Sequence, residues 1–159
     1  MIKKTFIGFS TLFVATLISG CSDSNRHINS EDEASFHYQI NQLCGDKPNC
    51  VSTLDTRKEH FIESFVLSDS GLSHWDQIKQ IALTLPGAAL AAEADGYFRI
   101  ENTSSIFRFV DDFEVKLSGK KLDIRSESRV GYSDFGVNRE RAEQFRQLLL
   151  NAGYLYSQK

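Results

Sequence analysis

Between residues 88 and 130 the chain carries four strand-like segments in succession, with turn signals between them. Asp95-Gly96 stands between the first two segments and strongly favours a two-residue hairpin turn. Ser118-Gly119-Lys120 separates the last two and is also typical of a tight turn. The four segments are residues 88–94, 97–103, 106–117 and 121–130. Consecutive strands joined by short turns predict an antiparallel meander.

Helical patterns lie on both sides of these strands in the sequence. The first helix is expected to begin with Ser73 as its N-cap and to end at Pro86-Gly87. The second is expected over residues 138–152, with Asn138 as its cap and Gly153 beyond its last turn. Residues 50–73 show no strong period, although 60–62 and 65–67 resemble short extended pieces. We therefore predict an α+β fold, an antiparallel meander sheet of about four strands with two helices packed on one face.

The long segment at 106–117 contains a conflict. Five apolar side chains share one parity and are expected to face the core, namely Phe107, Phe109, Phe113, Val115 and Leu117. Asp111 has the same parity, and a lone buried carboxylate is costly. Either a bulge near Asp111 turns it outward, or an arginine pairs with it.

The N-terminus predicts export and lipid attachment. A short basic start precedes an apolar run of about 15 residues, which is too short to span a bilayer. Ile18-Ser19-Gly20-Cys21 then resembles the lipobox of bacterial lipoproteins. We expect residues 1–20 to be a signal peptide and Cys21 to carry acyl chains. Residues 21–41 would form the lipidated start and a flexible polar tether, and residues 42–159 one domain.

Charge and the residue after Cys21 bear on location. Removing Lys3 and Lys4 with the signal peptide leaves 16 basic and 21 acidic side chains, a net charge of −5. An acidic chain has no electrostatic reason to bind nucleic acid. In lipoproteins the following residue influences sorting, and Ser22 lacks the Asp that retains many of them in the inner membrane. The resemblance therefore implies a lipid anchor on the periplasmic side of the envelope, with the outer membrane favoured.

Two cysteines remain for the folded part. Cys44 and Cys50 enclose Gly45 and Pro48, which favour turns, and an even pair in an exported domain usually forms a disulfide. The five intervening residues differ from the two of a typical redox pair. The four histidines are scattered, so we expect no metal site, and no glycine-rich phosphate loop or other cofactor motif is present in the sequence.

The stretch from 125 to 139 is the richest in chemistry. It holds three arginines, which suit planar contacts with carboxylate or phosphate groups, ahead of the expected start of a helix. We predict that one cluster forms in space from Asp111, Asp112, Arg125, Arg129, Asp134, Asn138 and Arg139. It would be either an anion-binding site or a set of structural ion pairs, and ion pairs are the favoured interpretation.

Three motifs in order resemble one bacterial family, the domain of unknown function numbered 1499. They are PNCVS at 48–52, FRFVDD at 107–112 and RSESRVGYSDFGVNR at 125–139, and the similarity runs from about residue 44 to residue 150. Glu127 departs from the family pattern, which commonly has Ala there. Family members are often exported, lipid-anchored or fused to membrane segments, and the resemblance implies no mechanism.

Two classes of function remain open from the sequence. A binding or structural module of the envelope is favoured, because no nucleophile motif, metal set or cofactor loop is recognisable. Its partners would be the membrane through the lipid anchor and an envelope protein or an anionic ligand. The alternative is a hydrolase or transferase acting on envelope lipid or glycan, with Asp112 or Asp134 beside an arginine. A deep pocket that collects Asp112, Arg125 and Asp134 would favour the enzyme.

Overall fold

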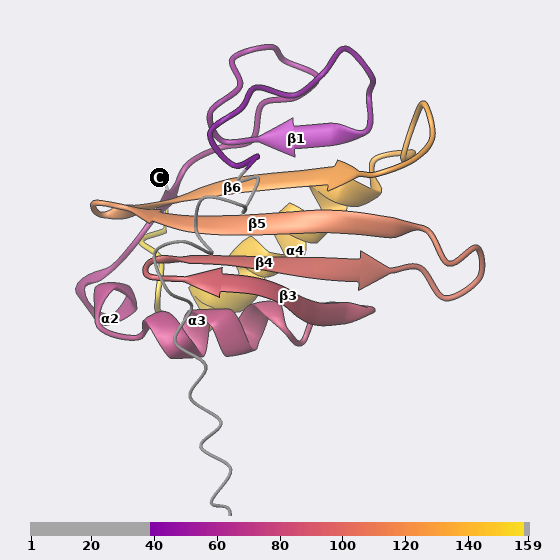
Figure 1. Ribbon diagram of the computed structural model, residues 1–159. Helices are drawn as coiled ribbons and strands as arrows, with labels where there is room; N and C mark the ends of the chain where they lie inside the picture. Colours follow the sequence, from indigo (N-terminus) through magenta and orange to yellow (C-terminus); the bar gives the residue numbers. More distant parts are fainter. Residues whose placement is uncertain (1–38, 158–159) are drawn as a thin grey trace, which may run out of the picture.

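The computed structural model describes residues 39–157, and the predicted signal peptide, Cys21 and the rest of 1–38 lie outside the described residues. Within that range a single antiparallel sheet is covered on one face by helices (Figure 1). The fold is therefore α+β, as predicted. None of the described helices has the length and apolar character needed to cross a membrane.

The predicted meander forms most of the sheet. Its four strands are β3 (Ala88–Ala94), β4 (Tyr97–Thr103), β5 (Val110–Ser118) and β6 (Lys121–Ser128), with β3 at one edge of the sheet and β6 next to two further strands. The sheet has six strands rather than four, because β1 (Cys50–Ser52) and β2 (Phe65–Val66) both pair with β6. These strands have three and two residues, so they are too short to show a period in the sequence. Both lie along the edge that β6 would otherwise leave unpaired.

Among residues 39–157, three helices rather than two accompany the sheet: α2 (Asp69–Leu72), α3 (Trp75–Ala82) and α4 (Val137–Asn151). Ser73 is not the N-cap of α3, because it ends α2 and its hydroxyl donates to the carbonyl of Asp69. His74 precedes α3 instead, without a side-chain cap. Gly153 follows α4 with a positive φ of 73°, as predicted for the end of this helix.

The core lies between the sheet and the helices. Phe113 of β5 meets Phe145 of α4 edge to face, with 5.4 Å between ring centroids, and Phe65 of β2 lies 6.0 Å from the same ring. Trp75 of α3 packs on Phe98 of β4 at 5.3 Å. All four phenylalanines are fully buried. The aromatic contacts therefore join three strands to both long helices in one core.

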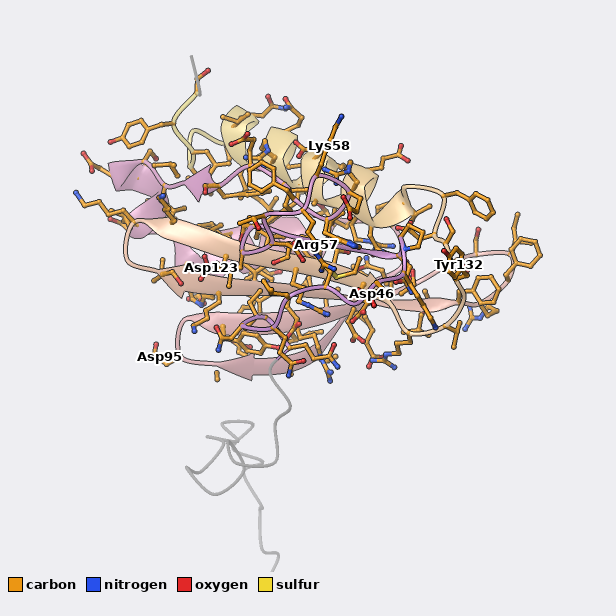
Figure 2. All side chains as sticks on the ribbon, turned by 90° about the horizontal axis from the view of Figure 1, so that it is seen from above. Asp46, Arg57, Lys58, Asp95, Asp123 and Tyr132 are labelled. Carbon is orange, nitrogen blue, oxygen red and sulfur yellow. A yellow bond between two sulfur atoms is a disulfide. The ribbon has the colours of Figure 1, made fainter. Side chains whose placement is uncertain are left out.

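The long strand is shorter than predicted. β5 begins at Val110, and residues 104–109 form the loop from β4, so Phe107 and Phe109 are 72 % and 54 % exposed instead of in the core. Arg108 between them adopts a positive φ of 57°, which breaks the alternation of a strand. Similarly, β6 ends at Ser128, and a loop leads through Tyr132 to α4. Figure 2 shows Tyr132 at one end of the sheet and Asp95 at the other.

Residues before β1 cross the face of the sheet that the helices leave open. Ile40 is 1 % exposed and packs with Ala92 and Tyr97 in a small second core. The predicted disulfide is present, and it joins Cys44 to Cys50 with 5.6 Å between the Cα atoms. The chain before β1 is thus held both to the sheet and to β1 itself.

Candidate functional site

The sheet divides the predicted cluster in two. Asp111 and Asp112 are neighbours on β5 and therefore point to opposite faces. Asp111 shares the face of Phe113, toward the helices, whereas Asp112 shares the face of Glu114. The predicted convergence of all seven residues on one site is therefore not what the structure shows.

On the helix face, Asp111 has an arginine partner. The partner is Arg141 of α4, whose Nη2 lies 2.7 Å from Oδ2 of Asp111, and both side chains are nearly buried. Nη1 of Arg141 also donates to Asn138 at 2.6 Å and to the hydroxyl of Ser126 at 3.1 Å. Of the two outcomes left open for Asp111, the structure thus has the arginine rather than the bulge.

Asn138 has a different role from the predicted helix cap. It lies inside α4, is 0 % exposed, and donates from Nδ2 to the carbonyl of Asn49 and to the hydroxyl of Ser128, both at 3.0 Å. Its Oδ1 accepts from Ser126 at 2.6 Å. We call Asp111, Arg141, Asn138, Ser126 and Ser128 the buried polar cluster. It ties α4 to β5, to β6 and to the residue before β1.

Asp134 is the residue that caps α4. Its carboxylate accepts from the backbone N–H groups of Gly136 at 3.1 Å and Asn138 at 2.7 Å. A carboxylate at this position satisfies N–H groups that a helix start leaves free, so this end of α4 is already occupied by the chain itself. Arg139 donates to two backbone carbonyls, those of Phe61 at 2.7 Å and Glu59 at 2.9 Å.

Arg125 and Arg129 lie on the open face of the sheet, where their partners are Glu127 and Asp112. Arg129 donates two hydrogen bonds of 2.8 Å to the Asp112 carboxylate and also forms an ion pair with Glu101. These two carboxylates raise the pKa of Arg129 above its ordinary value, with Asp112 as the larger cause. Arg125 is 4 % exposed and pairs with Glu127 at 2.8 Å.

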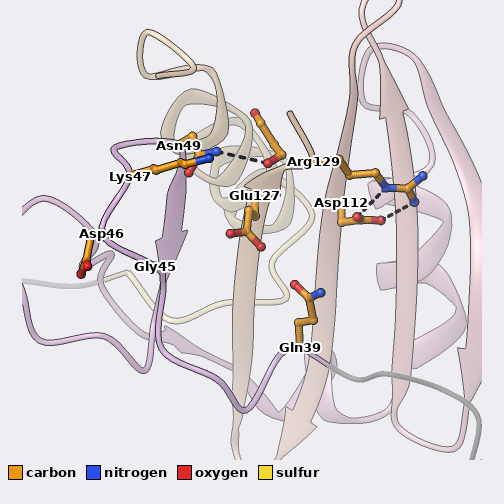
Figure 3. A pocket seen from close by; sticks show the side chains of 9 residues that line it. Gln39, Gly45, Asp46, Lys47, Asn49, Asp112, Glu127 and Arg129 are labelled. Atoms are coloured by element: carbon orange, nitrogen blue, oxygen red, sulfur yellow. Dashed lines mark hydrogen bonds and ion pairs between the residues drawn. The ribbon is translucent and has the colours of Figure 1, made fainter. Parts of the chain in front are cut away.

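A cavity of about 440 Å³ opens beside this second group. Asp112, Glu127, Ser128 and Arg129 line it from the sheet, and Gln39, Gly45, Asp46, Lys47 and Asn49 line it from the chain before β1 (Figure 3). In Figure 3 Asp112 and Arg129 point to each other at one side of the cavity, and Asp46 lies at the other. Asp134 and Arg139 line a separate cavity of about 280 Å³. Asp112 and Asp134 thus share neither a face nor a cavity.

A family model describing a protein of unknown function, DUF1499, matches residues 42–149. The chain belongs to this family. The match covers β1 to β6 and nearly all of α4, so it confirms the resemblance carried by the three motifs. The search of curated proteins gave no match.

The DUF1499 domain uses charged residues that the sequence reasoning did not single out. Arg141 is the main one, and its only sequence signal was the parity of Asp111, which left a bulge or an unnamed arginine partner as the two alternatives. Asp55 and Arg57 are a second case. Arg57 lies 2.7 Å from Asp55 and lowers the pKa of the Asp55 carboxyl. Asp55 accepts from the backbone N–H of Cys44 at 3.1 Å, and Arg57 donates to the carbonyl of Cys44 at 2.5 Å. This pair holds the disulfide loop.

Glu114 is the third case, and it lies under the chain that leads into the DUF1499 domain. Its carboxylate is 2 % exposed and accepts from the hydroxyl of Tyr97 at 2.7 Å and from the backbone N–H of Gln39 at 3.1 Å. Arg125 approaches it to 4.0 Å. Burial raises the pKa of Glu114 above its ordinary value of 4.5, although each of these three contacts favours the ionised form.

The DUF1499 domain offers no metal-ligand grouping in its described part, where no three His, Cys, Asp or Glu side chains gather as ligands would. The chemistry open to the predicted cluster is limited, because its charged side chains are paired with other side chains or with the backbone. Every charged residue of the predicted cluster already contacts another group of the same chain. The geometry therefore supports ion pairs and caps, the favoured interpretation of these residues.

Removing Arg141 should cost far more stability than removing Arg129. Arg141→Met leaves the Asp111 carboxylate buried without a partner, so we expect a loss of about 3–5 kcal/mol. Arg129→Met breaks a pair whose arginine is 41 % exposed, and it should cost about 1 kcal/mol. Urea denaturation measures both. Combining Arg141→Met with Asp111→Asn should cost less than the two single changes added, and simple additivity would contradict the pairing.

Glu114 should make stability depend on pH. The folded state binds this proton more tightly than the unfolded chain does, so ionisation of Glu114 destabilises the fold as the pH rises above 4.5. Below that pH the carboxyl is protonated in both states and the effect disappears. We therefore expect the stability of Glu114→Gln, relative to that of the unaltered protein, to increase as the pH rises from 4 to 8. Exposed Glu140→Gln is the control for loss of one charge, and an equal trend in both variants would refute the prediction.

Proposed function

We propose that this protein is a lipid-anchored module of the periplasmic side of the bacterial envelope, and that its DUF1499 domain binds or braces another component without catalysing a reaction. One observation carries the second half of this proposal. The carboxylates and arginines that the sequence offered for a reactive site are divided between two faces of the sheet and are paired on each.

The chemistry of each face supports a module. A general acid or base must reach a substrate proton, but Asp111 is buried against Arg141 and Asp134 is used by the N–H groups of α4. An anion-binding site needs free donors, but Arg125 and Arg129 face carboxylates and Arg139 faces carbonyls. An envelope protein or an anionic ligand would therefore have to be bound by other surfaces of the domain.

The anchor rests on the sequence of residues 1–21. The basic start, the short apolar run and Ile18-Ser19-Gly20-Cys21 support cleavage before Cys21 and acylation of its thiol and amine. Several acyl chains hold a protein stably on a membrane, whereas one chain holds it marginally. Ser22 supports sorting to the outer membrane.

An enzyme acting on envelope lipid or glycan is the alternative, and the cavity beside Asp112 is the observation that favours it. Asp112 and Glu127 both line that cavity, and two carboxylates near one space suit acid–base chemistry in principle. Each of them accepts hydrogen bonds from an arginine, which weakens this alternative.

The anchor predicts a change of location on mutation. In a bacterium with two membranes the unaltered protein should fractionate with the outer membrane, and mass spectrometry should find acyl chains on Cys21. Cys21→Ser should be soluble in the periplasm or left as an unprocessed precursor. Ser22→Asp keeps the lipidated cysteine and should move the protein to the inner membrane. Processed protein that stays on the membrane without acyl chains would contradict the proposal.

The absence of catalysis predicts no turnover. The purified lipidated protein, incubated with vesicles of envelope phospholipid and with peptidoglycan, should release no product detectable by mass spectrometry. Asp112→Asn and Asp134→Asn are matched controls, because either would abolish a reaction that used its carboxylate. Product formation by the unaltered protein, lost in one variant whose thermal melting shows a native fold, would establish the enzyme instead.

A further inference from the structure

Two loops meet at one end of the sheet, the end opposite the Asp95-Gly96 turn. Residues 104–109 join β4 to β5, and residues 129–136 join β6 to α4. They are adjacent because Val110 at the start of β5 pairs with Thr103 at the end of β4, and its carbonyl accepts from the N–H of Arg129 at 3.3 Å. Figure 1 shows both loops projecting beyond the strands at the same side of the molecule.

These loops expose a concentration of large apolar side chains. Six of them are more than half exposed: Ile106 (80 %), Phe107 (72 %), Phe109 (54 %), Val130 (56 %), Tyr132 (72 %) and Phe135 (96 %). We call these six residues the apolar loop end. Isolated exposed apolar residues are ordinary, but a group gathered at one end of a domain marks an interaction surface.

The backbone holds these side chains outward. In the described part of the chain, Arg108 and Phe135 are the non-glycine residues with positive φ, at 57° and 55°, and each belongs to one of the two loops. This conformation is unfavourable for bulky residues. At Arg108 it interrupts the alternation, so the rings of Phe107 and Phe109 stack on each other, 5.7 Å apart, in solvent. Folding alone gains nothing from exposing these rings, so their placement needs another explanation.

The charge at this end is also distinctive. Asp134 is turned inward to cap α4, and Arg129 is held by Asp112 and Glu101. Arg108 is exposed between two phenylalanines, and no ion pair joins it to the described part of the chain. The surface therefore presents aromatic and aliphatic groups with one free cation among them, which matches the interface of a bilayer, where acyl chains meet anionic phosphates.

The position of the chain entry brings a membrane within reach. Gln39 binds Glu114 of β5, four residues from Val110, so the entry lies about 13 Å along the strand from the loop end. The polar tether expected from the sequence between Cys21 and Gln39 would have a reach of roughly 20–25 Å. An anchor at Cys21 would thus keep the apolar loop end near the bilayer surface, where even weak insertion is effective because the local concentration is high.

We propose that the apolar loop end inserts into the interface of the same membrane leaflet that holds the lipid anchor, with Arg108 at the lipid phosphates; this rests on the lipid attachment proposed above. The six side chains lie on two projecting loops and not in a groove, which suits a deformable lipid surface better than a peptide. The insertion orients the domain, so that the Asp95-Gly96 and Ser118–Lys121 turns face away from the membrane.

The test uses the lipidated full chain in vesicles of phosphatidylethanolamine and phosphatidylglycerol. A single cysteine, introduced as Phe107→Cys or Phe135→Cys, carries an environment-sensitive fluorophore, and some lipids carry nitroxide quenchers. Tyr156→Cys is the matched control, because Tyr156 is 54 % exposed but lies beside β2 and the start of β6, at the other end of the sheet. We expect a blue shift and several-fold stronger quenching at 107 and 135 than at 156. Equal quenching at all three positions would overturn the proposal.

A second measurement separates the loops from the anchor. The Cys21→Ser chain without residues 1–20 should still float with these vesicles weakly, and Phe107→Ser with Phe135→Ser should abolish that flotation while Tyr156→Ser leaves it intact. Acyl chains missing from Cys21 with flotation retained would overturn the anchor alone. Acyl chains present with no loop quenching would overturn the insertion alone. Labels that are exposed in vesicles but protected in cells would point to a protein partner and likewise overturn it.

Discussion

Asp111 is a carboxylate at a core position of β5, and the fold depends on what surrounds it. Arg141 neutralises it, and Asn138 and Ser126 satisfy the remaining donors and acceptors, so no charge is buried alone. Because these groups come from β5, β6 and α4, and Asn138 also binds the carbonyl of Asn49, the cluster sets where α4 lies on the sheet and where β1 begins. Apolar packing around Phe113 and Phe145 would be less specific, since such contacts tolerate sliding.

On the open face of the sheet, buried polar groups are also paired, and there they hold the chain that precedes β1. Glu114 is buried under the chain before β1, and its carboxylate accepts from the backbone N–H of Gln39. Arg125 donates to the side-chain oxygen of Gln39. Asp55 and Arg57 then hold the backbone of Cys44 beside the disulfide. The segment that connects the domain to a proposed anchor is thus fixed to the sheet by buried polar contacts, and a pull on it would reach β5 and β6 directly.

The division of charges explains why the apolar loop end, and not the arginine-rich stretch, is the more informative surface. On both faces, the carboxylates and arginines that suggested a reactive site in the sequence are paired with other groups of the chain. The loops at the ends of β4 and β6 differ, since six of their side chains are large, apolar and more than half exposed. Such a surface suits the membrane-bound module that we propose.

Patterns in the amino-acid sequence were enough to predict the α+β class, the four strands of the meander with their turns, the disulfide and the family, and to show that Asp111 needed either an arginine partner or a bulge. These depend on local pattern: parity along a strand, turn residues and motif order. The folded chain adds that Arg141 pairs with Asp111, that the Asp134 side chain and not Asn138 caps α4, that β1 and β2 complete the sheet, and that Phe107 and Phe109 leave the core. Each of these depends on contacts between residues far apart in the chain, or on one positive φ at Arg108, and neither is written in the spacing of apolar residues.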